Sequence, residues 1–103
     1  MSDFEKVAKV DEIEPGKRLS VVVDDIPALV IRVGDEFYAI EDVCSHDGQP
    51  LSDGPIDGNE ITCPRHGARF NICSGAALCM PATEGVPTLE VEVRDGDLYV
   101  RAN

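Results

Sequence analysis

Two short motifs in the chain combine the residue types that bind soft transition metals. One is Cys44-Ser45-His46, and the other is Cys63-Pro64-Arg65-His66. Each offers one thiolate sulfur and one imidazole nitrogen, and together they supply four protein ligands. Glycine and proline surround both motifs, so we expect both in turns that wrap around one inorganic group and direct backbone N–H groups at it.

This ligand set fits two kinds of metal centre. A structural zinc site also uses two cysteines and two histidines, but zinc motifs usually place two cysteines together on one knuckle. In a Rieske-type [2Fe–2S] cluster, two thiolates hold one iron and two neutral imidazoles hold the other. One Cys and one His from each motif let each loop span both irons, which favours the cluster and leaves zinc as the alternative.

The similarity to iron–sulfur proteins extends beyond the four ligands. The relevant segments are Cys44-Ser45-His46-Asp47-Gly48, Pro50-Leu51-Ser52-Asp53-Gly54, Cys63-Pro64-Arg65-His66-Gly67-Ala68-Arg69-Phe70, and Ser74-Gly75 leading to Pro81-Ala82. On these residues the chain resembles the Rieske ferredoxin family, in motif detail over the cluster-binding half and in strand pattern and length elsewhere. The resemblance implies an all-β fold, with an antiparallel β-sandwich base and a smaller cluster-binding loop subdomain.

The resemblance also implies a role for each matching residue. Cys44 and Cys63 are expected to ligate the inner iron, and His46 and His66 the outer iron of one [2Fe–2S] cluster per chain. The second imidazole nitrogens would then lie near solvent, where a partner protein can approach. Pro81 matches the proline of the family's covering loop, which keeps water from the cluster; an ordinary turn proline is the alternative.

Four positions depart from the respiratory branch of this family. Gln49 and Arg65 occupy the places of two further cysteines, so the disulfide of that branch cannot form. Ala68 and Phe70 replace a Ser and a Tyr whose hydroxyls donate to cluster sulfurs. Such donors stabilise the reduced state, so their loss predicts a low potential, as in the ferredoxins of bacterial aromatic-ring dioxygenases.

The sequence predicts that short strands, separated by turns, position these motifs. The predicted strands are Phe4–Val10, Leu19–Asp24, Ala28–Val33, Glu36–Ile40, Glu60–Cys63, Leu89–Val93 and Leu98–Arg101. Their spacing predicts an antiparallel all-β domain, with hairpins at Val33–Glu36 and at Asp95-Gly96. Alternation over Leu89–Arg94 predicts three apolar side chains on the core face and three charged ones outside.

The stretch from Asp42 to Pro87 differs, because glycine and proline recur throughout it. We expect little regular structure there, and an ordering influence other than its own core, since loops of this length are uncommon in compact domains. All four cysteines and both histidines lie inside it. A single weak helical turn is predicted at Asp11–Glu14.

Length and charge limit the possible functions. The 103 residues predict one domain, 1–103, with its cluster-binding part at about 42–87. Twenty Asp and Glu against nine Lys and Arg give a net charge of −11, which disfavours nucleic acid and anionic membranes as partners. No run approaches the ~20 apolar residues of a membrane helix. The start of the chain does not resemble a secretion signal, so a cytoplasmic location and a monomer are expected.

Cys73 and Cys79 have no ligand-like spacing. A disulfide between them is conceivable, but small buried hydrophobes are the favoured interpretation in a reducing compartment. Arg65 and Arg69 bracket His66, and they either pair with carboxylates such as Asp47 or Asp53 or place positive charge beside the electron exit. The two aspartates could equally serve as turn formers.

The sequence therefore predicts an electron-transfer protein rather than an enzyme. Its expected partners are a reductase that supplies one electron and an acceptor such as the terminal oxygenase of a dioxygenase, bound through transient electrostatic docking. The residues suggest no nucleophile–base pair and no phosphate loop. The alternative is a small structural metal-binding interaction domain that holds zinc or a redox-silent cluster.

Overall fold

The chain folds into two antiparallel sheets, and the computed structural model describes residues 3–44, 50–65, 67–80 and 84–102. The larger sheet has the strand order β1-β10-β9-β4-β3-β2, and the smaller one β5-β6-β7-β8. The larger sheet contains β1 (Glu5–Lys9), β2 (Arg18–Val23), β3 (Ile26–Val33), β4 (Glu36–Glu41), β9 (Thr88–Arg94) and β10 (Asp97–Arg101). The smaller sheet contains β5 (Ile56–Asp57), β6 (Glu60–Thr62), β7 (Arg69–Asn71) and β8 (Ala77–Cys79).

The all-β prediction is confirmed, and both predicted hairpins are present. Asp95 and Gly96 have φ angles of 50° and 81°, and two positive φ angles give the twist that a two-residue hairpin needs. A third tight turn, at Asp24 and Asp25, has φ angles of 52° and 64° and joins β2 to β3. Asp tolerates this conformation better than most residues, but this turn is not among the hairpins predicted from the sequence.

The larger sheet folds over to form a sandwich. β4 pairs with β9 at only two positions, Ala39–Leu89 and Ile40–Thr88, so the β2-β3-β4 and β9-β10-β1 halves diverge beyond that point. The Asp24 amide donates to the Glu5 carboxylate at 3.0 Å, which links the β2–β3 turn to β1. Between the halves lies an apolar core that includes Val23, Leu98 and Val100, all fully buried.

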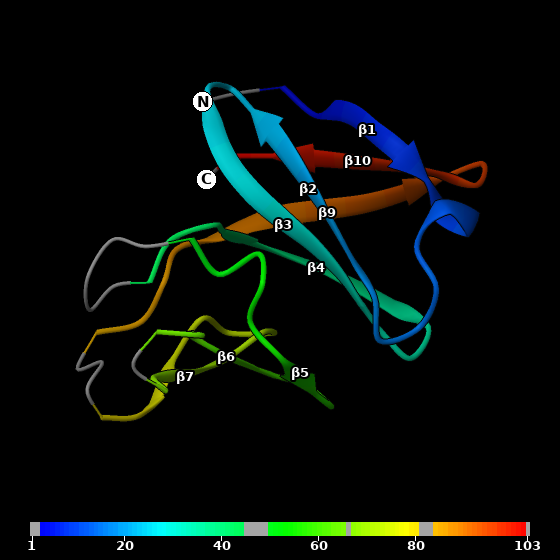
Figure 1. The fold of residues 1–103 in the computed structure, drawn as a ribbon. Coiled ribbons are helices and arrows are strands. Elements are labelled where there is room, and N and C mark those ends of the chain that lie inside the picture. Colours follow the sequence, from blue (N-terminus) through cyan, green and yellow to red (C-terminus); the bar gives the residue numbers. More distant parts are fainter. Residues whose placement is uncertain (1–2, 45–49, 66, 81–83, 103) are drawn as a thin grey trace.

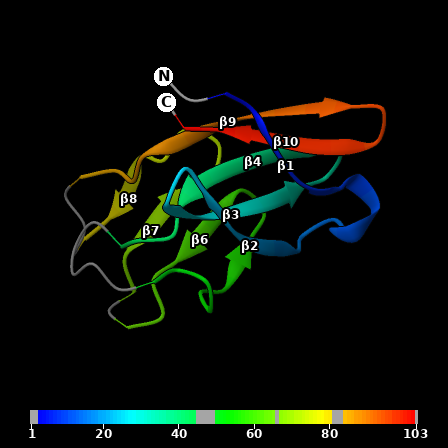
Figure 2. The same ribbon diagram turned by 90° about the horizontal axis from the view of Figure 1, so that it is seen from above.

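β3 is buried on both faces, which explains its continuous apolar run. Ala28 and Val30 point into the sandwich core, whereas Leu29 and Ile31 point into a second core beneath the smaller sheet. Successive strand residues face opposite sides, so one strand serves both cores. Both views place the smaller sheet against one face of the larger one (Figures 1 and 2).

The prediction of little regular structure between Asp42 and Pro87 is wrong in part. Four short strands cross this stretch, and the sequence pattern predicts only the one at β6. β5, β7 and β8 have two or three residues each. Strands this short leave too weak a periodic pattern to recognise, and packing on the second core orders them.

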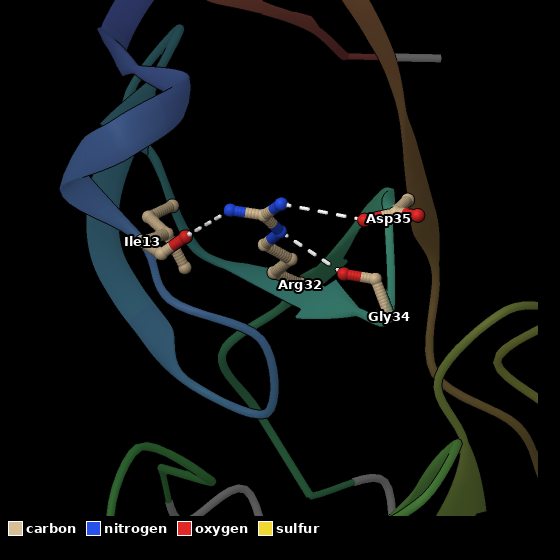
Figure 3. Close-up of polar contacts among 4 residues, drawn as sticks. All are labelled: Ile13, Arg32, Gly34 and Asp35. Carbon is tan, nitrogen blue, oxygen red and sulfur yellow. Dashed lines mark hydrogen bonds and ion pairs between the residues drawn. The ribbon is translucent and has the colours of Figure 1, made fainter.

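Arg32 fastens the connection between β1 and β2 to the β3–β4 turn. Its guanidinium donates to the carbonyl oxygens of Ile13 at 3.1 Å and Gly34 at 3.0 Å, and it faces Asp35 at 3.5 Å (Figure 3). The helical turn predicted at Asp11–Glu14 is observed as a shorter 3-10 turn, η1 (Val10–Glu12), which begins one residue earlier and ends two residues earlier. No helix within the described ranges is long and apolar enough to cross a membrane.

The predicted alternation of buried and exposed side chains in β9 is observed only in part. Leu89 is buried and Val91 packs against the sandwich core, as predicted. Val93 is 51% exposed, because β9 runs past the edge of the core toward the Asp95-Gly96 turn. The prediction of three core-facing residues is therefore wrong for Val93.

Candidate metal centre

The two motif cysteines that the sequence singled out are brought into one buried cluster. Cys44 follows β4 and Cys63 follows β6, and their exposed fractions are 0% and 1%. Both belong to the second core, and neither forms a disulfide. His46, His66 and Pro81 lie outside the described residues, so their roles stay predictions.

The first motif starts from a fixed base. The Asp42 amide donates to the Pro27 carbonyl at 2.9 Å, which ties the end of β4 to the start of β3. The Asp42 carboxylate accepts a hydrogen bond of 2.6 Å from the Leu51 amide, on the far side of the motif. A turn then closes through the Gly54 amide and the Leu51 carbonyl at 2.9 Å. Asp53 lies exposed in that turn, in agreement with a turn-forming role.

The second motif lies in a tight connection between β6 and β7. The Cys63 amide donates to the Ala68 carbonyl at 2.7 Å, and the Gly67 amide donates to the Cys63 carbonyl at 3.0 Å. Gly67 has a φ of +79°, a conformation that glycine adopts without steric penalty. These bonds satisfy both backbone groups of Cys63 and leave its sulfur free to act as a ligand.

A third segment closes the same core. Val86 is buried there, and its amide donates to the Gly75 carbonyl at 2.8 Å. Gly85 and Gly75 approach so closely that a Cβ on Gly85 would stand 2.5 Å from the Gly75 oxygen. Glycine at both positions therefore lets the chain before and after the predicted covering loop pack backbone to backbone.

The surroundings of the two thiols are apolar. Ala68 and Phe70 are both fully buried and share the second core with Cys44 and Cys63. Within the described part of the chain, no polar or charged side chain is buried. The two positions that lack the respiratory branch's hydroxyls thus place only methyl and phenyl groups in the core that contains the sulfurs.

Arg69 places a positive charge near the second motif, as expected. Its guanidinium lies 3.7 Å from the Glu60 carboxylate, a partner that the sequence did not predict. Asp47 lies outside the described residues, so its predicted pairing stays a prediction. A hydrogen bond with the Cys79 side chain, and the charges of Cys79 and Glu60, raise the pKa of Arg69. Arg65 is exposed.

The interpretation of Cys73 and Cys79 as buried hydrophobes is wrong. Cys73 is exposed, Cys79 is half-buried, and both are free thiols. Cys73 lies in the turn after β7, and Cys79 is on the edge strand β8, with its sulfur 3.6 Å from the Gly67 carbonyl oxygen. Their neighbours are polar groups and turn backbone, which the spacing of the cysteines could not reveal.

The residues fit a Rieske cluster. Two buried thiols in one core, neither of them in a disulfide, can ligate one iron. An antiparallel domain with such a pair of thiols, each two or three residues from a histidine in the sequence, is typical of an iron–sulfur electron carrier.

The chain belongs to the Rieske [2Fe–2S] domain family, whose model matches residues 3–90. This confirms the predicted cofactor, a Rieske-type [2Fe–2S] cluster, over zinc. The protein is an electron carrier, and it is not itself an enzyme.

Similar proteins cover almost the whole chain. Ferredoxin CarAc of Metapseudomonas resinovorans is 44% identical over 96 residues, which are 92% of this chain and 90% of that protein. The ferredoxin component of a Pseudomonas putida naphthalene 1,2-dioxygenase system is 38% identical, over 89% of this chain and 88% of that one.

Two solved structures share the fold closely. The ferredoxin of carbazole 1,9a-dioxygenase from Nocardioides aromaticivorans IC177 is 33% identical, with a TM-score of 0.94 over 99% of this chain and 100% of that chain. A chain in the complex of reduced oxygenase and oxidized ferredoxin in carbazole 1,9a-dioxygenase is 42% identical. Its TM-score is 0.91, over 97% of this chain and 94% of that chain.

Proposed function

We propose that this protein carries single electrons from a reductase to the terminal oxygenase of a ring-hydroxylating dioxygenase. The observation that carries the proposal is the burial of the Cys44 and Cys63 thiols in one apolar core, with neither in a disulfide. The relatives named as ferredoxin components match it over nearly their full length, which supports the same place in a redox chain.

The four motif residues are proposed to hold the cluster. Cys44 and Cys63 provide thiolates to the inner iron, and His46 and His66 provide imidazoles to the outer iron. When bound, the cluster supplies reversible one-electron chemistry. Cys44 and Cys63 anchor that iron below the surface, while the buried Ala68 and Phe70 exclude water and offer no hydroxyl to the sulfurs.

A docking surface adjoins the second motif. Leu78 on β8 is 46% exposed, and Met80, directly after β8, is 72% exposed. β8 is the edge strand of the smaller sheet, and Cys79 contacts the Gly67 carbonyl beside the His66 position. Arg69 faces Cys79 across the β7–β8 pair. Apolar and cationic groups thus accompany the expected electron exit on an otherwise acidic protein, and they can orient a partner whose surface is apolar and acidic at this point.

The proposal also includes the domain boundaries and the cellular compartment of the protein. Residues 1–103 form a single domain whose cluster-binding part spans about 42–87. The protein functions in the cytoplasm, where its free Cys73 and Cys79 thiols stay reduced.

Spectroscopy and electron transfer test the proposal together. The purified protein should contain two irons and two sulfides per chain, accept one electron, and show the visible and EPR spectra of a Rieske centre. It should then reduce the terminal oxygenase of an aromatic dioxygenase when a reductase is supplied. A colourless protein that holds one zinc, or a reducible protein that passes no electrons to any such oxygenase, would contradict the proposal.

A further inference from the structure

The peptide groups at Leu51 are held by two charged side chains from the sandwich. The Asp42 carboxylate accepts from the Leu51 amide at 2.6 Å. The Arg18 guanidinium donates to the Leu51 carbonyl at 3.4 Å and to the Ser52 carbonyl at 2.9 Å. The sequence separations of these three contacts are 9, 33 and 34 positions, so they are tertiary contacts rather than contacts within one turn. We call the side chains of Asp42 and Arg18 the clamps.

Both side chains start from rigid positions. Arg18 opens β2 and pairs with Ile31 in the central strand β3. Asp42 follows β4, and its own amide donates to Pro27. The sandwich therefore fixes the places from which the two clamps reach the cluster-binding part.

Leu51 connects the clamps to the thiols. Its side chain is fully buried in the core that also contains Cys44 and Cys63. Between Asp42 and Leu51 the sequence holds the whole first motif, so the Asp42 contact joins the residues on either side of that motif.

The same segment reaches the second motif. Gly54, whose amide donates to Leu51, packs directly against the backbone of Thr62. The Thr62 amide in turn donates to the Pro55 carbonyl at 3.0 Å, and Thr62 precedes Cys63. A continuous set of backbone contacts thus runs from the clamped Leu51 to the second cysteine.

We propose that Asp42 and Arg18 are positioning residues that hold the Leu51–Ser52 backbone and fix the Cys44 side of the site relative to the Cys63 side. The proposal rests on Cys44 and Cys63 as cluster ligands. Loss of Asp42 would leave the Leu51 amide without its charged acceptor, and a hydrogen bond of this type contributes enough that loop opening should become about tenfold or more easier.

The test compares cluster retention in matched variants of the cluster-loaded protein. Asp42→Ala and Arg18→Met should lose visible absorption to a chelator, EDTA, about tenfold or more faster than wild type. Asp42→Asn keeps an acceptor oxygen and should restore most of the retention. Asp57→Ala and Lys17→Met are the controls, because they remove the same charges from exposed positions.

Two further readouts separate loop closure from general destabilisation. Amide hydrogen exchange of peptides that cover Leu51 and Ser52 should quicken in Asp42→Ala and Arg18→Met, with β9 and β10 unchanged. The EPR line shape of the reduced cluster should change in Asp42→Ala and return in Asp42→Asn. If Asp42→Ala does not fold, Arg18→Met and Asp42→Asn decide the matter through the same readouts.

The possible failures are distinguishable. If wild type has a Rieske spectrum but the clamp variants retain the cluster and exchange amides as the controls do, the positioning role is overturned. If wild type has no such spectrum, the proposed function fails, while the exchange at Leu51 still reports whether the clamps exist.

Discussion

Gly54 packs so tightly against Thr62 that a Cβ at position 54 would lie closer than 3.0 Å to the Thr62 carbonyl oxygen, a separation that real Cβ atoms essentially never show. The neighbour is backbone and cannot rotate away. Gly54→Ala should therefore push the Leu51–Gly54 turn away from β6. We expect this change to lower the free energy of unfolding by about 3 kcal/mol. Denaturant midpoints of the cluster-loaded protein measure this.

Gly58→Ala is the matched control for that substitution. Gly58 has a φ of +62°, but a Cβ there would meet nothing within 4 Å. Only backbone strain opposes alanine, so a loss of about 1 kcal/mol is expected. Equal midpoints for the two variants would mean that the turn can leave β6 without loss of stability.

The cysteines should divide into two classes. Cys44→Ser or Cys63→Ser should remove or alter the visible spectrum, because each deletes a buried thiol that we propose as a cluster ligand. His46→Ala and His66→Ala should do the same. Cys73→Ser and Cys79→Ser should leave it intact, since Cys73 is exposed and Cys79 is half-buried on an edge strand. A spectrum that changes with Cys79→Ser but not with Cys63→Ser would contradict the ligand assignment.

The sequence was informative where one strong local signal decides the structure. Asp95-Gly96 could be read as a hairpin, because positive φ at both positions suits Asp and Gly. The Ala28–Val33 run marked a strand, although only the structure reveals that β3 serves two cores. The residue types and spacing around Cys44 and Cys63 predicted a Rieske-type [2Fe–2S] cluster, which the family match confirms.

What the sequence could not predict depends on tertiary contacts. β7 and β8 are too short for a periodic signal. The clamps from Arg18 and Asp42 reach residues distant in the sequence, so no local pattern reveals them. Exposure of Cys73 follows from the turn after β7, which composition alone does not locate.

Restoring a hydroxyl at position 68 or 70 should raise the reduction potential of the cluster. Ala68 and Phe70 are fully buried in the core that holds the two thiols. Ala68→Ser or Phe70→Tyr should introduce a donor to the cluster and raise the midpoint by tens of millivolts, since ~30 mV for one electron is about 0.7 kcal/mol, within the net worth of one hydrogen bond. Voltammetry measures the change, and unchanged midpoints in both variants would refute the argument.

Tyr38 on β4 is linked to the Cys73 turn. A hydrogen bond to the Cys73 side chain, followed by its charge, raises the pKa of Tyr38 above 10.0. A raised pKa in the folded state means that the contact stabilises the protein fully below the unfolded pKa of about 10 and is lost as pH rises through the folded value.

Cys73→Ala should therefore lower the pKa of Tyr38 toward 10.0. The chain has two tyrosines, so Tyr99 serves as an internal reference in an NMR titration of the rings. Cys79→Ala is the control and should leave the Tyr38 titration in place. A Tyr38 pKa that is the same with and without Cys73 would exclude the link.

Partner docking should depend on the sign of charge at Arg69 rather than on net charge alone. Arg69 is 54% exposed and belongs to the docking surface with Leu78 and Met80. Arg94 lies at the β9 end beside the β9–β10 turn, which both views place at the opposite end of the molecule from β7 and β8 (Figures 1 and 2). Arg69→Glu and Arg94→Glu change the net charge equally, so they separate local from global effects.

Arg69→Glu should slow electron transfer to the oxygenase or from the reductase severalfold without a shift of the midpoint, because a pairing contact becomes a repulsive one. Arg94→Glu should transfer electrons nearly as wild type does. Raising the salt should slow the wild-type reaction, since a chain of −11 is attracted to basic patches over distances that salt screens. Stopped-flow reduction across a range of ionic strength measures all three. Rates that stay flat with salt, together with identical behaviour of the two variants, would remove electrostatic docking from the account and leave the apolar contact of Leu78 and Met80 to orient the partner.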